Sequence, residues 1–202
     1  MGTDVTALSL LMEVVMGMSL AAACGLRAFL PMLAIGICER TGYLTLGAHF
    51  HWLGSTPALI VFGVAVAIEL VGDKVPAVDH ALDVMGLVVK PVAGAILASA
   101  AITDVDPLLA SVVGIITGGA MSAGVHVVKA KARVVSSAVT FGFANPFVSM
   151  VEDAFVALLT VLAILAPVIA LGLVLVTGYV MTRVLRRIFF RRRRDTAIVV
   201  AA

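Results

Sequence analysis

Residues 156–176 read VALLTVLAILAPVIALGLVLV, and no charged residue occurs between Asp153 and Arg183. The hydrocarbon core of a bilayer is about 30 Å thick, and a helix needs roughly 20 apolar residues to cross it. The stretch therefore predicts a membrane-spanning helix that starts near Pro146 and continues to about Thr182. Pro167 is expected to kink this helix, because proline removes a backbone hydrogen bond.

The whole chain has the composition of a membrane protein. Of its 202 residues, 62% are hydrophobic and only 13% are charged, about half the share of charged residues in an average soluble domain. A soluble domain of this length cannot cover so much apolar surface, whereas lipid can solvate it. The expected fold is all-α, a polytopic transmembrane helix bundle of about five or six spans, some of them kinked or broken.

Four further apolar segments precede the last one, at Val5–Cys38, Pro57–Asp73, Val78–Thr103 and Pro107–Lys129. The first is too long for a simple span and is interrupted by Gly17, Gly25, Arg27 and Pro31, so it is either one kinked helix or two shorter ones. The third segment divides at Lys90-Pro91.

Two polar connectors separate these segments, Glu39–Thr56 and residues 130–146. The first contains Trp52, an expected anchor at the membrane boundary. Between the third and fourth segments, Asp106-Pro107 predicts a turn followed by a helix start.

The basic residues are concentrated beyond the last apolar run. Seven of the fourteen are Arg183, Arg186, Arg187 and Arg191 to Arg194. By the positive-inside rule, the chain divides into a transmembrane domain at 1–182 and a basic cytoplasmic tail at 183–202 that contacts anionic lipid. Nucleic acid is not an expected partner. The expected location is the bacterial inner membrane, with a homodimer plausible for so small a chain.

The orientation of the bundle stays open at this stage. Five passes with a cytoplasmic C-terminus place Lys129, Lys131 and Arg133 on the outer side, against the usual bias. Either these cations point into the protein, or one segment is re-entrant.

Ionisable residues inside the apolar segments need a reason to be there, because a charge at a helix centre costs about 2.5–3.5 kcal/mol on insertion scales. Residues three or four apart share a helix face, and this spacing gathers the polar residues onto inward faces. The candidate site residues are Glu69, Asp73, Asp79, Asp83, His126, Lys129, Arg133, Asn145, Ser149, Glu152 and Asp153. Gly114, Gly118 and Ser122 lie on the same stripe as His126 and predict close helix packing.

These groups favour a small transporter or channel-like protein that moves an ion or small solute. Carboxylates would bind a cation or proton, and Lys129 or Arg133 would supply the countercharge. Helix breaks near Gly25 and Pro31, and at Pro91 and Pro146, would free backbone groups to line the path.

Other interpretations stay open. The charges could form a static brace, with Glu69 paired to Lys129 or Asp83 to Lys90, in a membrane scaffold or lipid-binding protein without transport. An intramembrane enzyme would need Ser149 beside His126. No motif predicts a cofactor or a catalytic residue. No metal is assigned, although carboxylate oxygens would favour magnesium or calcium.

Several stretches resemble, in order, a bacterial membrane-protein family catalogued as domain of unknown function 4126. They are Gly25–Pro31, Glu69 with Asp73–Pro76 and Asp79, Lys90–Ala95, Asp104–Pro107, His126 with Lys129, Lys131 and Arg133, and Asn145-Pro146 with Ser149 and Glu152-Asp153. The resemblance covers roughly residues 10–175. It implies a helical inner-membrane protein and marks the same polar positions, but it implies no activity.

Overall fold

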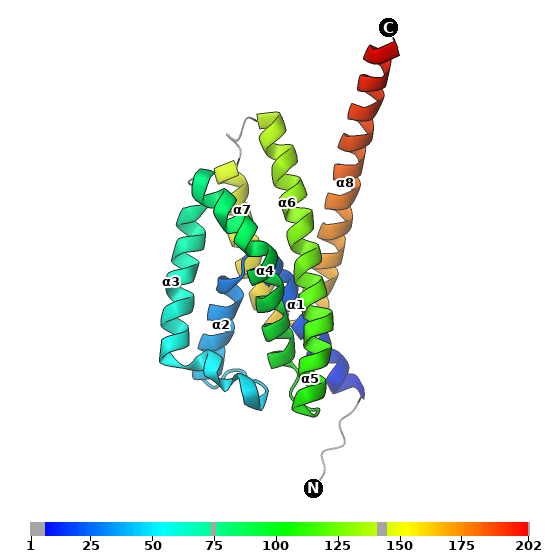
Figure 1. Ribbon diagram of the computed structural model, residues 1–202. Coiled ribbons are helices and arrows are strands. Elements are labelled where there is room, and N and C mark those ends of the chain that lie inside the picture. Colours follow the sequence, from blue (N-terminus) through cyan, green and yellow to red (C-terminus); the bar gives the residue numbers. More distant parts are fainter. Residues whose placement is uncertain (1–6, 74–75, 141–144, 202) are drawn as a thin grey trace.

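The computed structural model describes the backbone of residues 7–73, 76–140 and 145–201. Side chains are described for the same ranges except 76, 77, 79, 80, 135–140, 145–147 and 188–201. Every regular element in these ranges is a helix, and the helices pack side by side into one bundle (Figure 1). The predicted all-α polytopic bundle is confirmed.

The elements follow in chain order: α1 (Ala7–Leu26), α2 (Phe29–Arg40), the 3-10 helix η1 (Ala48–Gly54), α3 (Thr56–Gly72), α4 (Pro76–Ala101), α5 (Pro107–Gly114), the π-helix η2 (Ile115–Gly119), α6 (Ala120–Thr140), α7 (Asn145–Leu165) and α8 (Pro167–Ala201). The Asp106 side chain caps α5 by accepting hydrogen bonds from the amides of Leu108 and Leu109 at 2.9 and 3.3 Å. The predicted turn and helix start at Asp106-Pro107 are therefore confirmed.

Helix α1 lies at the centre of the bundle because small residues let its neighbours approach. A Cβ atom at Gly17 would lie 3.0 Å from the backbone of Ala98 in α4. A Cβ atom at Gly25 would lie 2.6 Å from the carbonyl oxygen of Ser122 in α6. Residues 19–25 of α1 are all buried, and Leu26, the next residue, is partly exposed. Without a hydrophobic driving force between helices in lipid, such close backbone packing is what holds them together.

Helices α1 and α2 form a re-entrant hairpin. At its open end, the Glu13 carboxylate accepts a hydrogen bond from the Thr103 amide at 3.1 Å, and the Gly47 amide donates to the Ala100 carbonyl at 2.9 Å. Both ends of the hairpin therefore lie at the same end of α4 (Figure 1). With 12 residues, α2 extends about 18 Å, which is too short to cross a bilayer core of about 30 Å.

The tip of the hairpin is at Arg27-Ala28, between the two helices. By helical rise, it lies about 21 Å along α1 from Glu13. Of the four interruptions predicted for the first segment, only the one at Arg27 separates two helices. Gly17 and Gly25 lie inside α1, and Pro31 lies in the first turn of α2, where an N–H group has no intrahelical partner to lose.

The other helices alternate in direction along the bundle. Within the described ranges, five helices are long and apolar enough to cross a membrane, or six when η1 and α3, bent by 61°, count as one span. One of those is α1, which returns through α2. Apart from this hairpin, the candidate spans are η1–α3, α4, α5–α6, α7 and α8. The start of α1 and the end of α8 lie at opposite ends of the bundle (Figure 1).

The predicted connector at 130–146 is wrong over most of its length, since α6 continues to Thr140. Its polar, serine- and glycine-containing composition suggested a loop, but Arg133 is buried and ion-paired, and no glycine or proline occurs in it before Gly142.

Two other expected breaks also differ from the structure. Pro91 lies inside α4 instead of dividing it. At Pro167 the chain starts a new helix that runs back along the bundle, in place of a kink (Figure 1). Residues 183–201, expected as a tail, continue α8, because arginine favours helix and the chain has no breaker there.

The small residues predicted to pack closely, Gly114, Gly118 and Ser122, contact α4. A Cβ atom at Gly114 would lie 2.2 Å from the Ser99 hydroxyl, and one at Gly118 would lie 2.5 Å from the Gly94 carbonyl oxygen. One turn further, the Ser122 hydroxyl donates to the carbonyl of Lys90 at 2.7 Å. The two backbones are therefore in direct contact along this stripe.

We expect Gly118→Ala to destabilise the bundle by about 1–3 kcal/mol, the usual cost of overpacking. Its Cβ atom would lie 2.4 Å from that of Ala98. Gly124→Ala on the same helix is the matched control, because nothing lies within 4 Å of a Cβ atom there and alanine favours helix by up to about 1 kcal/mol. Thermal unfolding in detergent measures both, and equal midpoints would contradict the packing.

The hairpin predicts which loops face the same side of the membrane. In a Cys24→Ala, Cys38→Ala background, single cysteines at Leu8, Tyr43 and Arg187 are labelled in sealed vesicles with an impermeant maleimide. We expect Leu8→Cys and Tyr43→Cys to react from one side and Arg187→Cys from the other. Reaction of Leu8→Cys and Tyr43→Cys from opposite sides would mean that α1 or α2 crosses alone.

Candidate functional site

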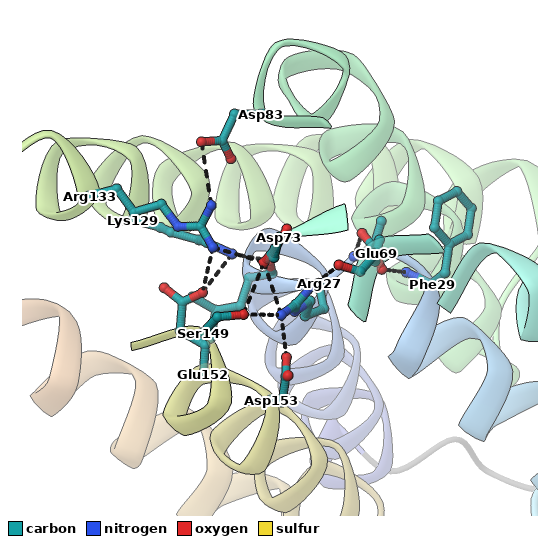
Figure 2. A network of polar contacts seen from close by, with 12 residues as sticks. Arg27, Phe29, Glu69, Asp73, Asp83, Lys129, Arg133, Ser149, Glu152 and Asp153 are labelled. Atoms are coloured by element: carbon teal, nitrogen blue, oxygen red, sulfur yellow. Dashed lines mark hydrogen bonds and ion pairs between the residues drawn. The ribbon is translucent and has the colours of Figure 1, made fainter. Parts of the chain in front are cut away.

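Charged side chains from five parts of the fold converge around the tip of the hairpin (Figure 2). They come from the α1–α2 turn, the end of α3, the first half of α4, the middle of α6 and the start of α7. Among the described side chains, the cations are Arg27, Lys90, Lys129 and Arg133, and the carboxylates are Glu69, Asp73, Asp83, Glu152 and Asp153. These four cations and five carboxylates are the candidate site, and all except Lys90 are joined into one network by ion pairs or hydrogen bonds.

Arg27 is the centre of this network and is 2% exposed. Its Nη2 atom lies 3.0 Å from Asp73, contacts Asp153, and donates to the Ser149 hydroxyl at 2.9 Å. Its Nη1 atom donates to the backbone carbonyl of Glu69 at 2.8 Å. A planar guanidinium can hold several acceptors at fixed angles, so one side chain joins α3 and α7 to the hairpin.

The broken helix ends at the tip are capped by charges from other helices. The Glu69 carboxylate accepts hydrogen bonds from the Ala28 and Phe29 amides, at 3.1 and 3.2 Å, at the start of α2. Lys129 Nζ donates to the Leu26 carbonyl at 3.0 Å, at the end of α1. A helix has a partial positive charge at its N-terminus, which a carboxylate stabilises, and a partial negative charge at its C-terminus, which a cation stabilises. Glu69 and Lys129 therefore each have the sign that stabilises the helix end they contact.

Arg133 and Lys129 tie α6 to the same network. Arg133 Nη2 lies 2.8 Å from Asp73 and 3.5 Å from Glu152, and its Nη1 atom lies 3.7 Å from Asp83. Lys129 Nζ lies 2.8 Å from Glu152. The Asp83 contact is the longest of these, and its side chain is 27% exposed, so Asp83 is the carboxylate least fixed by a partner.

Lys90 and His126 form a separate contact between α4 and α6. Lys90 Nζ lies 3.2 Å from His126 Nδ1, and both side chains are buried. Neither takes part in an ion pair with a described carboxylate.

A small cavity opens beside the network. Its lining includes Arg27, Phe29, Glu69, Asp83, Gly86 and Lys90, and about 70 Å³ is available to the centres of water-sized molecules. A single water needs about 10–15 Å³ by this measure, so several fit. The cavity is therefore large enough to hold several water molecules beside the charges.

The structure brings together most of the predicted site residues. Glu69, Asp73, Asp83, Lys129, Arg133, Ser149, Glu152 and Asp153 belong to the network, and His126 adjoins it through Lys90. The side chains of Asp79 and Asn145 lie outside the described residues. In the described part of the chain, no three His, Cys, Asp or Glu residues are grouped to hold a metal.

Two central residues were missing from the sequence-based set of site residues, Arg27 and Lys90. Both lie in stretches that resemble the family, and Lys90 was considered as a brace partner of Asp83, but neither was among the site residues. The signal that could have found Arg27 is its place between Gly25 and Pro31, at the expected helix break. Since the backbone groups at a break need partners, a charge located there belongs to the site.

The specific pairings proposed for a static brace are wrong. Glu69 caps α2 instead of pairing with Lys129, and the contact of Asp83 is Arg133 instead of Lys90. The Ser149 hydroxyl bonds Arg27 and Asp73, while His126 bonds Lys90. The serine and histidine of the suggested hydrolase therefore have different partners.

The fold and the site together define a multi-pass helical membrane protein with a buried, water-accessible network of charges. The family model described as Domain of unknown function (DUF4126) matches residues 14–187. The chain belongs to this family, as the sequence resemblance indicated. No curated protein and no solved structure matches it significantly.

Removing the central guanidinium is expected to destabilise the protein more than removing any exposed arginine. Arg27→Gln leaves Asp73 and Asp153 short of a partner in a buried place, which costs about 3–5 kcal/mol. Arg186→Gln is the control, because Arg186 is exposed on α8 and such substitutions change stability by about 0.5 kcal/mol or less. Thermal unfolding and yield of folded protein measure the difference; similar values for both variants would contradict the central role of Arg27.

Proposed function

We propose that this protein is a small transporter or channel-like protein that moves an ion or small solute through the charged network at the hairpin tip. The observation that carries the proposal is the joint position of the broken helix, the buried charges and the cavity. Discontinuous helices with charged side chains at membrane depth are how many transporters build their sites. A bundle held together by packing alone needs none of the three.

The balance of charge supports a small ion. The cavity lining contains the acids Glu69, Asp73 and Asp83 and the bases Arg27, Lys90 and Lys129. An incoming cation would be attracted to Asp83, whose partner Arg133 is 3.7 Å away. Arg133 keeps closer contacts with Asp73 and Glu152, so Asp83 can exchange partners without leaving Arg133 unpaired.

The distribution of basic residues supports an orientation with the C-terminal end of α8 in the cytoplasm. The second half of α6 and the exposed arginines Arg183, Arg186 and Arg187 lie toward the same end of the bundle (Figure 1). Because the α1–α2 hairpin does not cross, Lys129, Lys131 and Arg133 then lie toward the cytoplasm, as the positive-inside rule favours. Lys129 and Arg133 also point into the protein.

Flux into proteoliposomes tests the proposal across a panel of cations, protons and anions. We expect Asp83→Asn to reduce flux strongly, because it removes the least constrained carboxylate of the cavity. Asp153→Asn should also reduce flux, by loosening Arg27. Glu69→Gln is expected to lower both flux and stability, since Glu69 caps α2.

Asp104→Asn is the matched control for charge, because Asp104 is an exposed residue of the loop before α5, and its flux should equal that of the wild type. Flux at the level of empty liposomes in the wild type, for every solute of the panel, would remove the transport proposal. A scaffold or lipid-binding protein with a static network would give that result.

A further inference from the structure

The contact between Lys90 and His126 differs from the ion pairs of the network because neither partner is a carboxylate. It joins two nitrogen bases, Lys90 Nζ and His126 Nδ1, at 3.2 Å. Their residues are 6% and 2% exposed. Arg27, Lys129 and Arg133 each contact at least one carboxylate within 3.0 Å, whereas Lys90 contacts no described carboxylate within 4.0 Å.

A hydrogen bond between two such nitrogens limits how many protons they hold. One nitrogen must donate a hydrogen and the other must offer a lone pair. An ammonium group and a doubly protonated imidazole are both donors only. At this separation the pair therefore carries at most one positive charge. Either the Lys90 ammonium donates to a neutral His126, or a protonated His126 donates to the free amine of Lys90, or both groups are neutral.

The surrounding residues hold this pair in place. The Ser122 hydroxyl donates to the Lys90 carbonyl at 2.7 Å and fixes the backbone of α4 against α6. Gly86 leaves room for the two side chains, since a Cβ atom there would lie 3.1 Å from Lys90 Cε and 3.2 Å from His126 Cε1. Gly86 and Lys90 also line the cavity, so water can reach the pair.

We propose that the Lys90–His126 pair is a reversible proton-binding site and that the protein moves or couples to protons through it. A hydronium ion in the cavity gives its proton to the free amine of Lys90, which forms an N–H bond and leaves a water molecule. Release is the reverse step, with the proton returned to water. The inference rests on the proposed transport function for the movement of protons, but not for their binding.

The charged groups that face the pair explain why it, and not a neighbour, exchanges the proton. Asp83 on α4 and Glu69 on α3 favour the protonated pair, while Lys129 and Arg133 on α6 oppose it. Arg27, Lys129 and Arg133 each contact a carboxylate at 3.0 Å or less. Lys90 has no such partner among the described carboxylates, so its charge is the one that no ion pair of the network stabilises.

The decisive variant is Lys90→Arg, because a guanidinium keeps its proton at every accessible pH while the positive charge is retained. In proteoliposomes with an internal pH dye, we expect proton movement in the wild type and its loss in Lys90→Arg. Lys90→Met should lose it as well, which covers the case in which the longer arginine does not fit. Lys131→Met, which removes an exposed lysine from α6, the helix of His126, should leave proton movement unchanged.

Nitrogen NMR of the full chain in lipid nanodiscs tests proton binding without transport. The chain has four lysines and four histidines, and the signals of Lys90 and His126 are assigned by their loss in Lys90→Met and His126→Gln. We expect both signals to change together in one pH transition, as coupled sites do. In Lys90→Met the His126 signal should lose the shift that marks a hydrogen-bonded Nδ1.

The outcomes separate the two proposals. Independent transitions of Lys90 and His126, or wild-type proton movement in Lys90→Arg, would overturn the proton site. A third outcome is that the wild type moves another solute but no protons, and that Lys90→Arg moves this solute equally well. This result would support the transport function and overturn the proton site. If no solute moves at all, the transport function is lost, and the NMR transition alone decides whether the pair binds a proton.

Discussion

The structure depends on the satisfaction of backbone groups at a helix break inside an apolar bundle. Between Leu26 and Phe29 the helical hydrogen bonds are interrupted, and no bulk water is available there to replace them. Each unsatisfied group would cost several kcal/mol in hydrocarbon. Glu69 and Lys129 bond the two ends, and Arg27 at the break bonds the carbonyl of Glu69 in turn. The charges are at membrane depth because the break requires them.

The need to bond the broken helix ends explains most of the charged residues as structural, but not all of them. Capping occupies Glu69 and Lys129, and holding Arg27 occupies Asp73, Ser149 and Asp153. Asp83, Lys90 and His126 are not needed for either task, yet they are beside the cavity or buried next to it. The groups in excess of the structural requirement are therefore the ones on which the functional proposals rest.

The sequence predicted the membrane-helix class and most of the site, because both follow from spacing and hydrophobicity. Small residues at intervals of four marked the faces where α4 and α6 touch, and Gly114 and Gly118 lie there. It did not predict the length of α6, since a charge that is paired inside the protein looks the same in sequence as a charge in a loop. It left open whether the first segment is one kinked helix or two shorter ones and whether any segment is re-entrant, because the direction in which α2 leaves Arg27 is set by contacts with residues far along the chain.

Those long separations have a consequence for biosynthesis. The amides at the start of α2 are bonded by a residue 41 positions later, and the carbonyl at the end of α1 by one 103 positions later. Chains are made from the N-terminus, so the ribosome delivers the hairpin before either partner exists. The first two helices must wait at the water boundary or within the insertion machinery until α6 has emerged. The hairpin is thus synthesised before its partners and can take up its final contacts only after they have been made.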